Sequence, residues 1–589
     1  MSRRFLLSAC AALTAGILTA GIAAAGTAKA TWPSLQSQLA QDRVPAGSPL
    51  AKLIAANQDF QLLRPEEAYD KIAVPAWLRV LWHKEHPDMR YVPGDGSGGY
   101  PLVLKEVHEW MASHPSLQPG SPDRSAPDKK KPTGGPKPTP GPDYSISGVQ
   151  VSPRSESDIR VNFWDPSRIV GSSNNLHGGG TLAMFSSADG GATWTQTVLP
   201  RDIQEAFQSD PAVDWTSDGT VWATAISIFT SPTRLFLHAF KSTDGGATWK
   251  LDANISSPDQ SSADKQMMWV DHSDQSPYKD TIHVIWHNGR AVFVSHHTPG
   301  GGWSDPLQIS GGETLGTGIG SDIKTDGLGR VYAFWPDTGS RKIYFAKSTD
   351  GGSSFSRPVA VSPTFQSFQT ILPAQFSRGV LLYTTAGVSI NGKNVNVYVA
   401  WTDLVGGRGC STPYDDPDDN VNSACKTRIW FAKSTDGGTK WAKAKAINNP
   451  SSKNDQLNPW LAVDESSGLL GLMYYDTVGE SRTSVNVFFQ SSANGGTTWS
   501  TPVRVSSASS DDEDFNDPNQ FGDYNALSGI AGTFFPSWTD RRDPSGKEEI
   551  WTAPIRFQAK SCPSADADSP GLKIFVDDIE DLFAAPCAP

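Results

Sequence analysis

Acidic side chains and one tyrosine stand just before several short apolar runs of this sequence. Asp210 precedes "PAVDW", Asp264 precedes "KQMMWV", and Asp523 and Tyr524 precede "NALSGI". Two carboxyl groups can pass a proton to and from a reacting oxygen, and a tyrosine becomes a nucleophile when a neighbouring base takes its proton. We therefore predict that Tyr524, Asp210, Asp264 and Asp523 are catalytic.

Cationic and acidic residues at comparable places complete a predicted rim. Each stands either before the first apolar run of a repeated unit or after the second, so a fold that stacks these units brings them to one face. The predicted substrate-binding residues are Arg160, Lys265, Arg290, Asp322, Asp540 and Arg541. For each one taken singly, the alternative is a polar residue that caps a strand where it meets water.

Two acidic loops raise the question of a metal ion. "DDPDDN" contains Asp415, Asp416 and Asp418, and "DDEDFNDPNQFGD" runs from residue 511 to 523. Calcium takes six to eight oxygen ligands, so the first three residues are candidate metal ligands and Ca²⁺ is the possible cofactor. Neither loop has the spacing of an EF-hand, and a solvated acidic loop is the alternative.

The elements that position these residues belong to a repeat. The turns "SSADGGATW", "KSTDGGATW", "KSTDGGSSF", "KSTDGGTKW" and "SSANGGTTW" end at residues 194, 249, 355, 441 and 499. Between them run short apolar strands joined by Gly-containing turns, with the fifth unit opening at "ILPAQFSRGVLLYTT". Four short strands in each period of about 50 residues are typical of a β-propeller blade. We predict a mainly β fold over 145–558, a seven-bladed propeller, with six blades as the alternative.

The repeated turn resembles the Asp-box of the sialidase-like (BNR/Asp-box repeat) β-propeller family. Ser242, Asp244, Gly246, Thr248 and Trp249 match its Ser-x-Asp-x-Gly-x-Thr-Trp pattern. The resemblance implies that the box is a folding element on the face away from the active site. The residues it assigns to this structural role are Asp189, Asp244, Asp350 and Asp436.

The same resemblance implies an activity. Sialidases of this fold bind the substrate carboxylate with three arginines, attack with a tyrosine activated by a glutamate, and protonate the leaving group with an aspartate. Here Tyr524 suits the nucleophile, the Phe-Arg-Ile-Pro segment is absent, and no glutamate partner can be assigned. We expect a propeller that acts on glycans as a glycoside hydrolase, a sialidase or other exo-glycosidase. A non-catalytic glycan- or protein-binding propeller and a polysaccharide lyase remain alternatives.

The first thirty residues resemble an export signal. Arg3 and Arg4 precede an apolar run, and Ala28-Lys29-Ala30 is a small-x-small cleavage site. We expect a secreted or periplasmic protein, cleaved after Ala30 and not transmembrane, because no other apolar run approaches about 20 residues. The net charge of −12 argues against a nucleic-acid partner, which would need clustered cations.

The remaining segments flank the repeat. Apolar residues at helical spacing predict a small α-helical domain over 31–114, and the Pro/Gly/Lys-rich stretch 115–144 predicts a linker. Residues 559–589 form a C-terminal extension. The four cysteines beyond Cys10 fall in two local pairs, which predicts disulfides joining Cys410 to Cys425 and Cys562 to Cys587. A zinc site is the weaker alternative, because no Cys-x-x-Cys accompanies them.

Overall fold

The computed structural model describes residues 137–557 with interruptions at 149–151, 177–179, 231, 367–368, 373, 392–393, 406–425, 453, 479–483, 512–519 and 543–546. The predicted signal, the helical domain, the C-terminal extension, all four paired cysteines and Asp415, Asp416 and Asp418 lie outside the described residues. In the part that is described, no helix is long and apolar enough to cross a bilayer.

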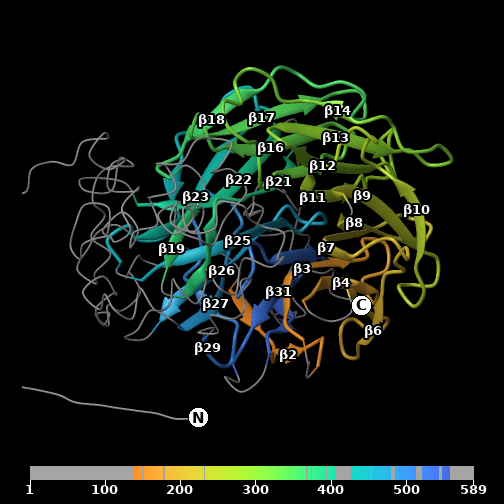
Figure 1. The fold of residues 1–589 in the computed structure, drawn as a ribbon. Helices are drawn as coiled ribbons and strands as arrows, with labels where there is room; N and C mark the ends of the chain where they lie inside the picture. The colour runs from red at the N-terminus through yellow and green to blue at the C-terminus, as the bar shows by residue number, and fades with distance from the viewer. Residues whose placement is uncertain are drawn as a thin grey trace, which may run out of the picture.

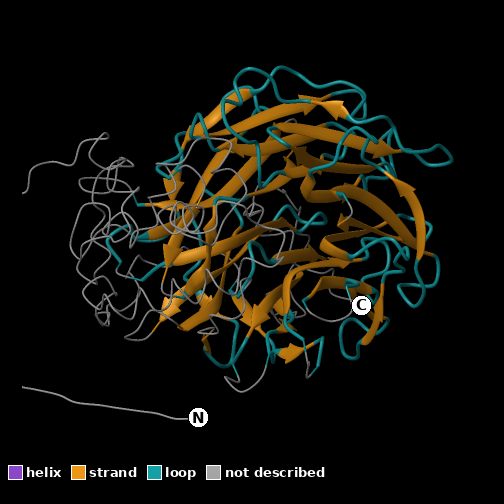
Figure 2. Ribbon diagram, viewed as in Figure 1, coloured by secondary structure: helices purple, strands orange, loops and turns teal. Residues whose placement is uncertain are grey.

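Seven antiparallel sheets of at least four strands are arranged as a ring (Figures 1 and 2), and we call the centre of this ring the channel. Blade one holds β3 (Arg154–Val161), β4 (Ile169–Asn175), β5 (Ala183–Ser187) and β6 (Thr195–Val198). Blade two holds β7 (Phe207–Trp215), β8 (Val221–Thr230), β9 (Thr233–Ser242) and β10 (Lys250–Asn254). Blade three holds β11 (Ala263–Val270), β12 (Ile282–Asn288), β13 (Ala291–His297) and β14 (Leu307–Gln308).

The remaining blades follow the same order. Blade four holds β15 (Asp322–Thr325), β16 (Val331–Asp337), β17 (Lys342–Ser348) and β18 (Val359–Pro363). Blade five holds β21 (Thr384–Asn391), β22 (Asn394–Leu404), β23 (Thr427–Ser434) and β24 (Lys445–Ala446). Blade six holds β25 (Gln456–Val463), β26 (Leu470–Val478), β27 (Ser484–Ser492) and β28 (Val503–Arg504), with β29 (Ser510–Asp511) beside β27. The prediction of seven blades is confirmed.

Blade seven is completed by the N-terminal end of the described chain. Its strands β30 (Ala526–Ile530), β31 (Thr533–Asp540) and β32 (Glu549–Thr552) take β2 (Tyr144–Ser145) as their fourth strand. In addition β1 (Pro138–Pro140) pairs with β33 (Ile555–Phe557). Residues 138–140 and 144, which the sequence analysis assigns to the linker, therefore pair with the last blade and close the ring without leaving an open edge there.

An extra hairpin interrupts the repeat between blades four and five. Strands β19 (Gln369–Leu372) and β20 (Gln375–Leu381) pair only with each other, and the inner strand of blade five begins afterwards, at Thr384. The predicted opening of the fifth unit was therefore wrong. The apolar residues of "ILPAQFSRGVLL" resemble those of an inner strand. The inner strand of blade five is instead formed by the next segment, Thr384–Asn391.

Large aromatic side chains on the second strands fill the spaces between blades. Trp286, Trp335, Trp401 and Trp538 lie at matching places on β12, β16, β22 and β31, and each is at most 1% exposed. Each stands two residues before a polar residue at or near the strand end, as in "VYAFWPD". Burying these rings holds neighbouring blades together.

The repeated turns share one hydrogen-bond pattern. In the turn after β9, Asp244 Oδ1 accepts from Ser242 Oγ at 2.7 Å and from Thr248 N at 2.8 Å, and Oδ2 accepts from Thr248 Oγ1 at 2.6 Å. Gly246 lies at a φ of 95°, which only glycine adopts readily. These turns follow third strands, so they lie at the same end of each blade as the hairpin between its first and second strands.

The inner strands begin with a shared irregularity. β3, β7, β11 and β25 each contain a bulge near the start. The residue in the bulge has positive φ: 53° at Glu156, 53° at Asp210, 55° at Lys265 and 46° at Asn458. Non-glycine residues with this backbone are uncommon and concentrate at functional sites.

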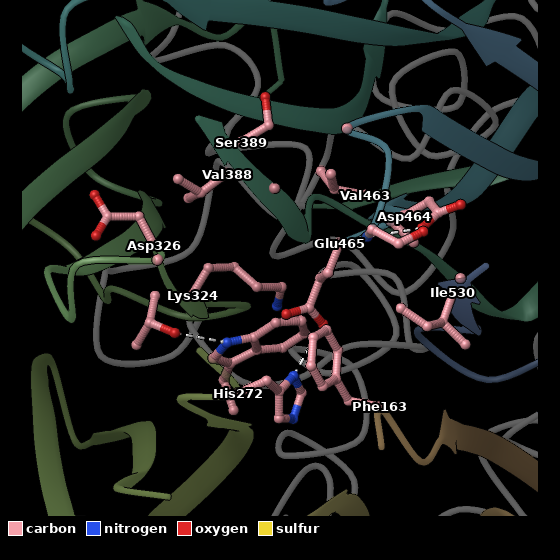
Figure 3. A pocket seen from close by; sticks show the side chains of 18 of the residues that line it. Phe163, His272, Lys324, Asp326, Val388, Ser389, Val463, Asp464, Glu465 and Ile530 are labelled. Atoms are coloured by element: carbon pink, nitrogen blue, oxygen red, sulfur yellow. Dashed lines mark hydrogen bonds and ion pairs between the residues drawn. The ribbon is translucent and has the colours of Figure 1, made fainter. Parts of the chain in front are cut away.

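The channel has two chemically different ends. The bulges and the strand starts lie at one end, whereas the strand ends and the first hairpins lie at the other. At the hairpin end a cavity of about 450 Å³ opens between blades, with side chains such as His272, Lys324 and Glu465 on its walls (Figure 3).

Candidate functional site

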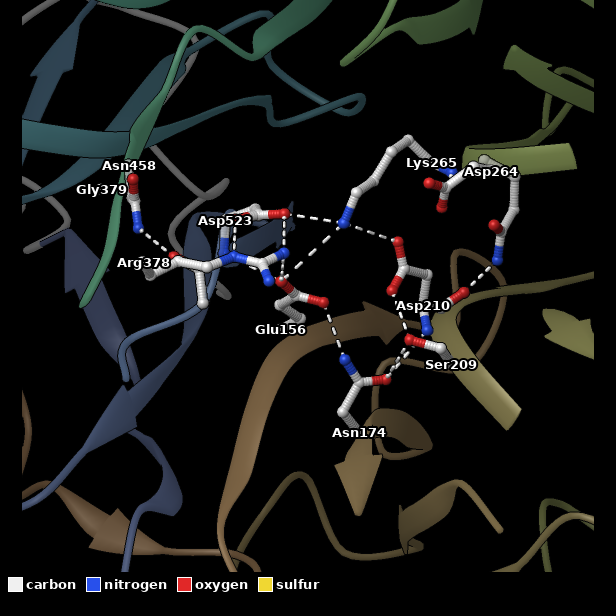
Figure 4. Close-up of polar contacts among 12 residues, drawn as sticks. Glu156, Asn174, Ser209, Asp210, Asp264, Lys265, Arg378, Gly379, Asn458 and Asp523 are labelled. Atoms are coloured by element: carbon white, nitrogen blue, oxygen red, sulfur yellow. Dashed lines mark hydrogen bonds and ion pairs between the residues drawn. The ribbon is translucent and has the colours of Figure 1, made fainter. Parts of the chain in front are cut away.

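The strand-start end of the channel holds a compact group of charged residues, which we call the strand-start cluster. It comprises Glu156, Asp210, Lys265, Arg378 and Asp523 together with the hydroxyl groups of Tyr383 and Tyr524. Figure 4 shows the five charged side chains converging from different blades and from the inserted hairpin. The bulges direct this convergence, because an extra residue in an inner strand re-aims its side chain.

Lysine and arginine side chains link the three carboxyl groups. Lys265 Nζ lies 2.7 Å from Asp523 Oδ2, 3.1 Å from Asp210 Oδ2 and 4.0 Å from Glu156 Oε1. Arg378 binds Asp523 with two parallel contacts, Nε to Oδ1 at 2.6 Å and Nη2 to Oδ2 at 2.5 Å. Arg378 Nη2 also lies 3.3 Å from Glu156 Oε1. Bidentate pairing of this kind fixes geometry as well as charge.

Three carboxyl groups face two cations, so neutrality requires one proton on a carboxyl group. Burial raises the pKa of Glu156 well above its usual range, and Asp523 and Asp210 add to this rise. Burial would also raise the pKa of Asp210, but Lys265 and a hydrogen bond from Glu156 hold it below its usual value. Arg378 and Lys265 similarly hold the pKa of Asp523 well down against the effect of burial. Glu156 is therefore the member that takes up a proton most readily, whereas the two aspartates stay ionised to lower pH.

Two tyrosine hydroxyl groups accompany this network. The Tyr383 and Tyr524 rings lie 5.7 Å apart, and within the described residues neither hydroxyl has a hydrogen-bond partner. Burial, followed by the charges of Asp210 and Glu156, raises the pKa of Tyr524 well above its usual range. A buried hydroxyl without a partner costs free energy, so its presence in the cluster needs a reason.

The inserted hairpin β19–β20 covers the strand-start cluster. Besides the Arg378 contacts, Gln375 Nε2 donates to Gly522 O at 2.6 Å, and Arg378 N donates to Gln520 Oε1 at 3.2 Å. The charged side chains of the cluster are at most 8% exposed. Tyr524 itself is 2% exposed, so the cluster is closed to solvent in this structure.

Four of the predicted site residues meet here: Asp210, Lys265, Asp523 and Tyr524. Asp264 does not, although it precedes Lys265, since its carboxylate turns toward His287 Nε2, 3.9 Å away, and is 24% exposed.

The other predicted residues lie elsewhere. Arg290 is exposed in the turn after β12. Asp322 accepts from the backbone of Ile323 and Ala386, and thereby joins blades four and five. The remaining three are Asp540, which accepts from Trp538 Nε1, Arg541, which lies 3.5 Å from Glu548, and Arg160, which lines the cavity at the opposite end.

Sequence reasoning missed Glu156, Arg378 and Tyr383. The register of the repeat carries a signal for Glu156, because it precedes Asp210 by one blade length and Asp210 precedes Lys265 by another. No repeat signal marks Arg378, since its hairpin lies outside the repeat. In the described part of the chain, no group of three or more His, Cys, Asp or Glu side chains is arranged to hold a metal ion.

Comparison with known proteins gives distant structural matches only. No family model matches the chain, and no curated protein matches it. A protein of unknown function from Dyadobacter fermentans is 12% identical with a TM-score of 0.39, covering 72% of this chain and 99% of its own. The GH93 α-L-arabinofuranosidase of Fusarium graminearum is 12% identical with a TM-score of 0.38, covering 71% and 98%. A leech intramolecular trans-sialidase is 12% identical with a TM-score of 0.39, covering 64% and 71%. All three TM-scores are below 0.5, so these matches are not used to assign the fold. The assignment of a seven-bladed propeller rests on the strand order within the seven sheets.

Proposed function

We propose that this chain is a glycan-acting propeller, a glycoside hydrolase that reacts at the strand-start cluster. One observation carries the proposal: the Tyr524 hydroxyl has no hydrogen-bond partner within the described residues and lies near Asp210 and Glu156, of which Glu156 takes up a proton more readily. Glycoside hydrolysis needs such a set, because one group must give a proton to the leaving oxygen while another supports attack at the sugar carbon.

The roles follow from the protonation states. Tyr524 Oη forms the bond to the anomeric carbon as its proton passes to Asp210, and the leaving oxygen takes the proton of Glu156 as its bond to the sugar breaks. Water then attacks the anomeric carbon, its proton returns to Glu156, and the Tyr524 oxygen leaves with the proton held by Asp210. Each group ends in its starting state, as a catalytic cycle requires.

The cations support this assignment. Lys265 faces Asp210 and Asp523 at once, so it keeps Asp210 ionised and ready to accept a proton. Arg378 reaches the cluster from the hairpin, which makes entry of a sugar dependent on withdrawal of that arginine. An acidic sugar would suit the exposed guanidinium, because arginine pairs with carboxylates in a bidentate manner.

A second candidate function is a binding propeller without catalysis. The observation that favours it is the complete pairing of the buried charges, since Arg378 and Lys265 already satisfy Asp523. In that case the cluster only closes the channel, and ligand would bind elsewhere. A polysaccharide lyase, with Tyr524 or Lys265 as the base, differs from the hydrolase in its products.

The decisive experiment is mass spectrometry after the protein is incubated with sialosides, neutral glycosides including arabinofuranosides, and uronic-acid polymers. Products that have gained water establish a hydrolase, and fragments one water lighter establish a lyase. Loss of turnover in Tyr524→Phe and Asp210→Asn, with retention in Tyr398→Phe as the matched buried control, places the reaction at the cluster. No product from any substrate overturns the enzyme proposal in favour of binding.

We also propose that the protein is exported. The support is the sequence of residues 1–30. N-terminal sequencing of the protein recovered outside the cytoplasm is expected to begin at Thr31, and recovery of an intact Met1 there would contradict cleavage after Ala30.

A further inference from the structure

The hairpin-end cavity is a second site, at the opposite end of the channel from the strand-start cluster. Its walls come from the ends of inner strands and the hairpins that follow them in blades one, three, four, five, six and seven. Its volume of about 450 Å³ lies within the range of small-molecule sites.

One wall of the cavity is cationic. Lys324 Nζ stands over the Trp269 ring at 4.7 Å from the centroid, and the Arg160 guanidinium lies 5.4 Å from the same centroid. Both side chains are about 5% exposed. Arg160 Nη1 lies 3.4 Å from Asp158 Oδ1, and Arg160 Nε, although it has no hydrogen-bond partner within the described residues, is itself buried. Lys324 Nζ donates to Asp322 Oδ1 and Ile323 O, which leaves one of its three N–H groups for a ligand.

The acidic groups near this wall are already engaged. Asp158 accepts from the backbone of Ile159 and Val213, and Asp322 accepts from Ile323 and Ala386. The hairpin aspartates that line the cavity are bound within or beside their own turns: Asp271 by Ser276, Asp326 by Arg330 and Tyr332, and Asp464 by Ser466 and Gly532.

The cavity already receives one carboxylate, from the chain itself. Glu465 reaches across from the hairpin of blade six to His272 of blade three, with 2.9 Å between Oε1 and Nδ1. His272 is also bound by Asp214 and lies under the Phe163 ring, whereas the Glu465 side chain remains 29% exposed. Glu465 thus places one carboxylate at the His272 side of the cavity.

Three apolar side chains lie on the opposite wall, beside Ser389 and Asp464. Val388 of β21, Val463 of β25 and Ile530 of β30 face the cavity across from Lys324 and His272 (Figure 3). A ligand that satisfies both walls must carry an anionic head and an apolar body. We propose that the hairpin-end cavity binds a small amphipathic carboxylate, with its carboxylate at Lys324 Nζ and its apolar body against Val388, Val463 and Ile530.

The test compares three ligands of equal chain length, octanoate, octanol and octylamine, by calorimetric titration of the whole protein. The expected result is that octanoate binds at least about tenfold more tightly than the other two, as a charge-assisted hydrogen bond predicts. If octanol bound as tightly as octanoate, the proposed contact between the ligand carboxylate and the cationic wall would be overturned. Tighter binding of octylamine, or no binding of any of the three, would overturn the proposal entirely.

Two variants locate the binding. Lys324→Met keeps the length of the side chain and is expected to lower octanoate affinity about tenfold while leaving octanol unchanged. Val388→Trp fills the cavity from a partly exposed position and is expected to abolish the binding of octanoate and of octanol. Lys250→Met, at an exposed position of β10, is the charge-matched control and should bind octanoate normally. Unchanged octanoate binding in both cavity variants, with their thermal unfolding shown to be cooperative, would overturn the site.

Discussion

Arg378 Nη2 lies 2.5 Å from Asp523 Oδ2, although Arg378 belongs to β20 and Asp523 to the loop before β30, and β20 and β30 do not pair. The arginine comes from the hairpin inserted between blades four and five, and the aspartate precedes the inner strand of blade seven. This contact therefore fastens the hairpin over the channel at the place where the polar inner-strand starts converge. It also accounts for much of the low pKa of Asp523.

Replacing Arg378 by Met is expected to destabilise the protein by about 3–5 kcal/mol, because it leaves a buried carboxylate without its bidentate partner. Denaturant unfolding measures the loss. Arg357→Met, at an exposed arginine, is the control and should change stability by less than about 0.5 kcal/mol.

The double variant separates the ion pair from general packing. Combining Arg378→Met with Asp523→Asn is expected to cost clearly less than the two single changes added together, since the second change removes the charge that the first left unpaired. Strict additivity would show that the two side chains contribute independently, and would contradict the pairing described here.

The proton on Glu156 predicts how stability depends on pH. The pKa of Glu156 is raised in the folded protein, so the folded state holds its proton where the unfolded state has lost it. Its stabilising contribution is present below a pH of about 4.5 and is lost as the pH rises toward the folded pKa. Glu156→Gln should therefore gain stability relative to the wild type as the pH rises from 5 to 8, by at most about 1.4 kcal/mol per pH unit.

Unfolding free energies at several pH values in that range check this prediction. Asp305→Asn, an exposed carboxyl-to-amide change, supplies the baseline. A Glu156→Gln variant that is weaker than the wild type by the same amount at every pH would mean that Glu156 is ionised throughout, and would remove the proton donor from the proposed mechanism.

The sequence predicts the repeated part of this molecule far better than the inserted part. The number of blades can be predicted from turns and apolar runs at a fixed spacing. Each blade packs against its neighbours in the same way and therefore uses the same residue types at the same places. Asp210, Lys265, Asp523 and Tyr524 could be placed at strand starts for that reason. Asp264 was predicted together with them but lies outside the cluster, because neighbouring residues in a bulge diverge and the backbone decides which side chain faces the channel.

The hairpin β19–β20 marks the limit of such reasoning. Its short apolar runs resemble the openings of the other repeated units. Arg378 reaches Asp523 over 145 residues of sequence separation. A contact of this range depends on ring closure and on the insertion together, and neither is encoded by the period of the repeat. The charge balance of the cluster is likewise visible only once all five side chains are in place.

His272 at the hairpin end predicts a second pH dependence, of the same sign but in a higher window. Burial would lower the pKa of His272, but Glu465 and Asp214 raise it well above its usual value. The stability that the charged imidazole contributes is fully present below pH 6.5 and is lost as the pH rises through the folded pKa. The stability difference between wild type and His272→Gln should therefore shrink from pH 6.5 to pH 9.

Nuclear magnetic resonance titration of the imidazole measures the same quantity directly. The expected result is a His272 resonance that titrates above pH 6.5, and that shifts to lower pH in Glu465→Gln. His297→Gln, on the outer part of blade three, is the control for histidine loss and should leave the His272 titration unchanged. A His272 resonance that titrates below pH 6.5 would contradict the bridge to Glu465.

The fifth repeated turn has an asparagine where the other four have an aspartate, and this difference predicts the effect of the same change in the second turn. Asn494 replaces the aspartate there, yet it accepts from Ser492 Oγ at 3.0 Å and from Thr498 N at 2.9 Å. Its amide donates to Thr498 Oγ1 at 2.7 Å, in place of the hydroxyl that donates to Asp244 in the second turn. Asp244→Asn should therefore keep nearly all of the stability at neutral pH, whereas Asp244→Ala should lose about 1–2 kcal/mol, because three hydrogen bonds disappear.

Acid unfolding distinguishes the two variants further. The side-chain and backbone hydrogen bonds from Thr248 lower the pKa of Asp244 to about 2, so the wild-type turn weakens as the pH falls from about 3.8 through 2. Asp244→Asn cannot titrate and should lose none of its contribution over that interval. If Asp244→Asn were as unstable as Asp244→Ala at neutral pH, the carboxylate charge and not the hydrogen-bond geometry would hold the turn together.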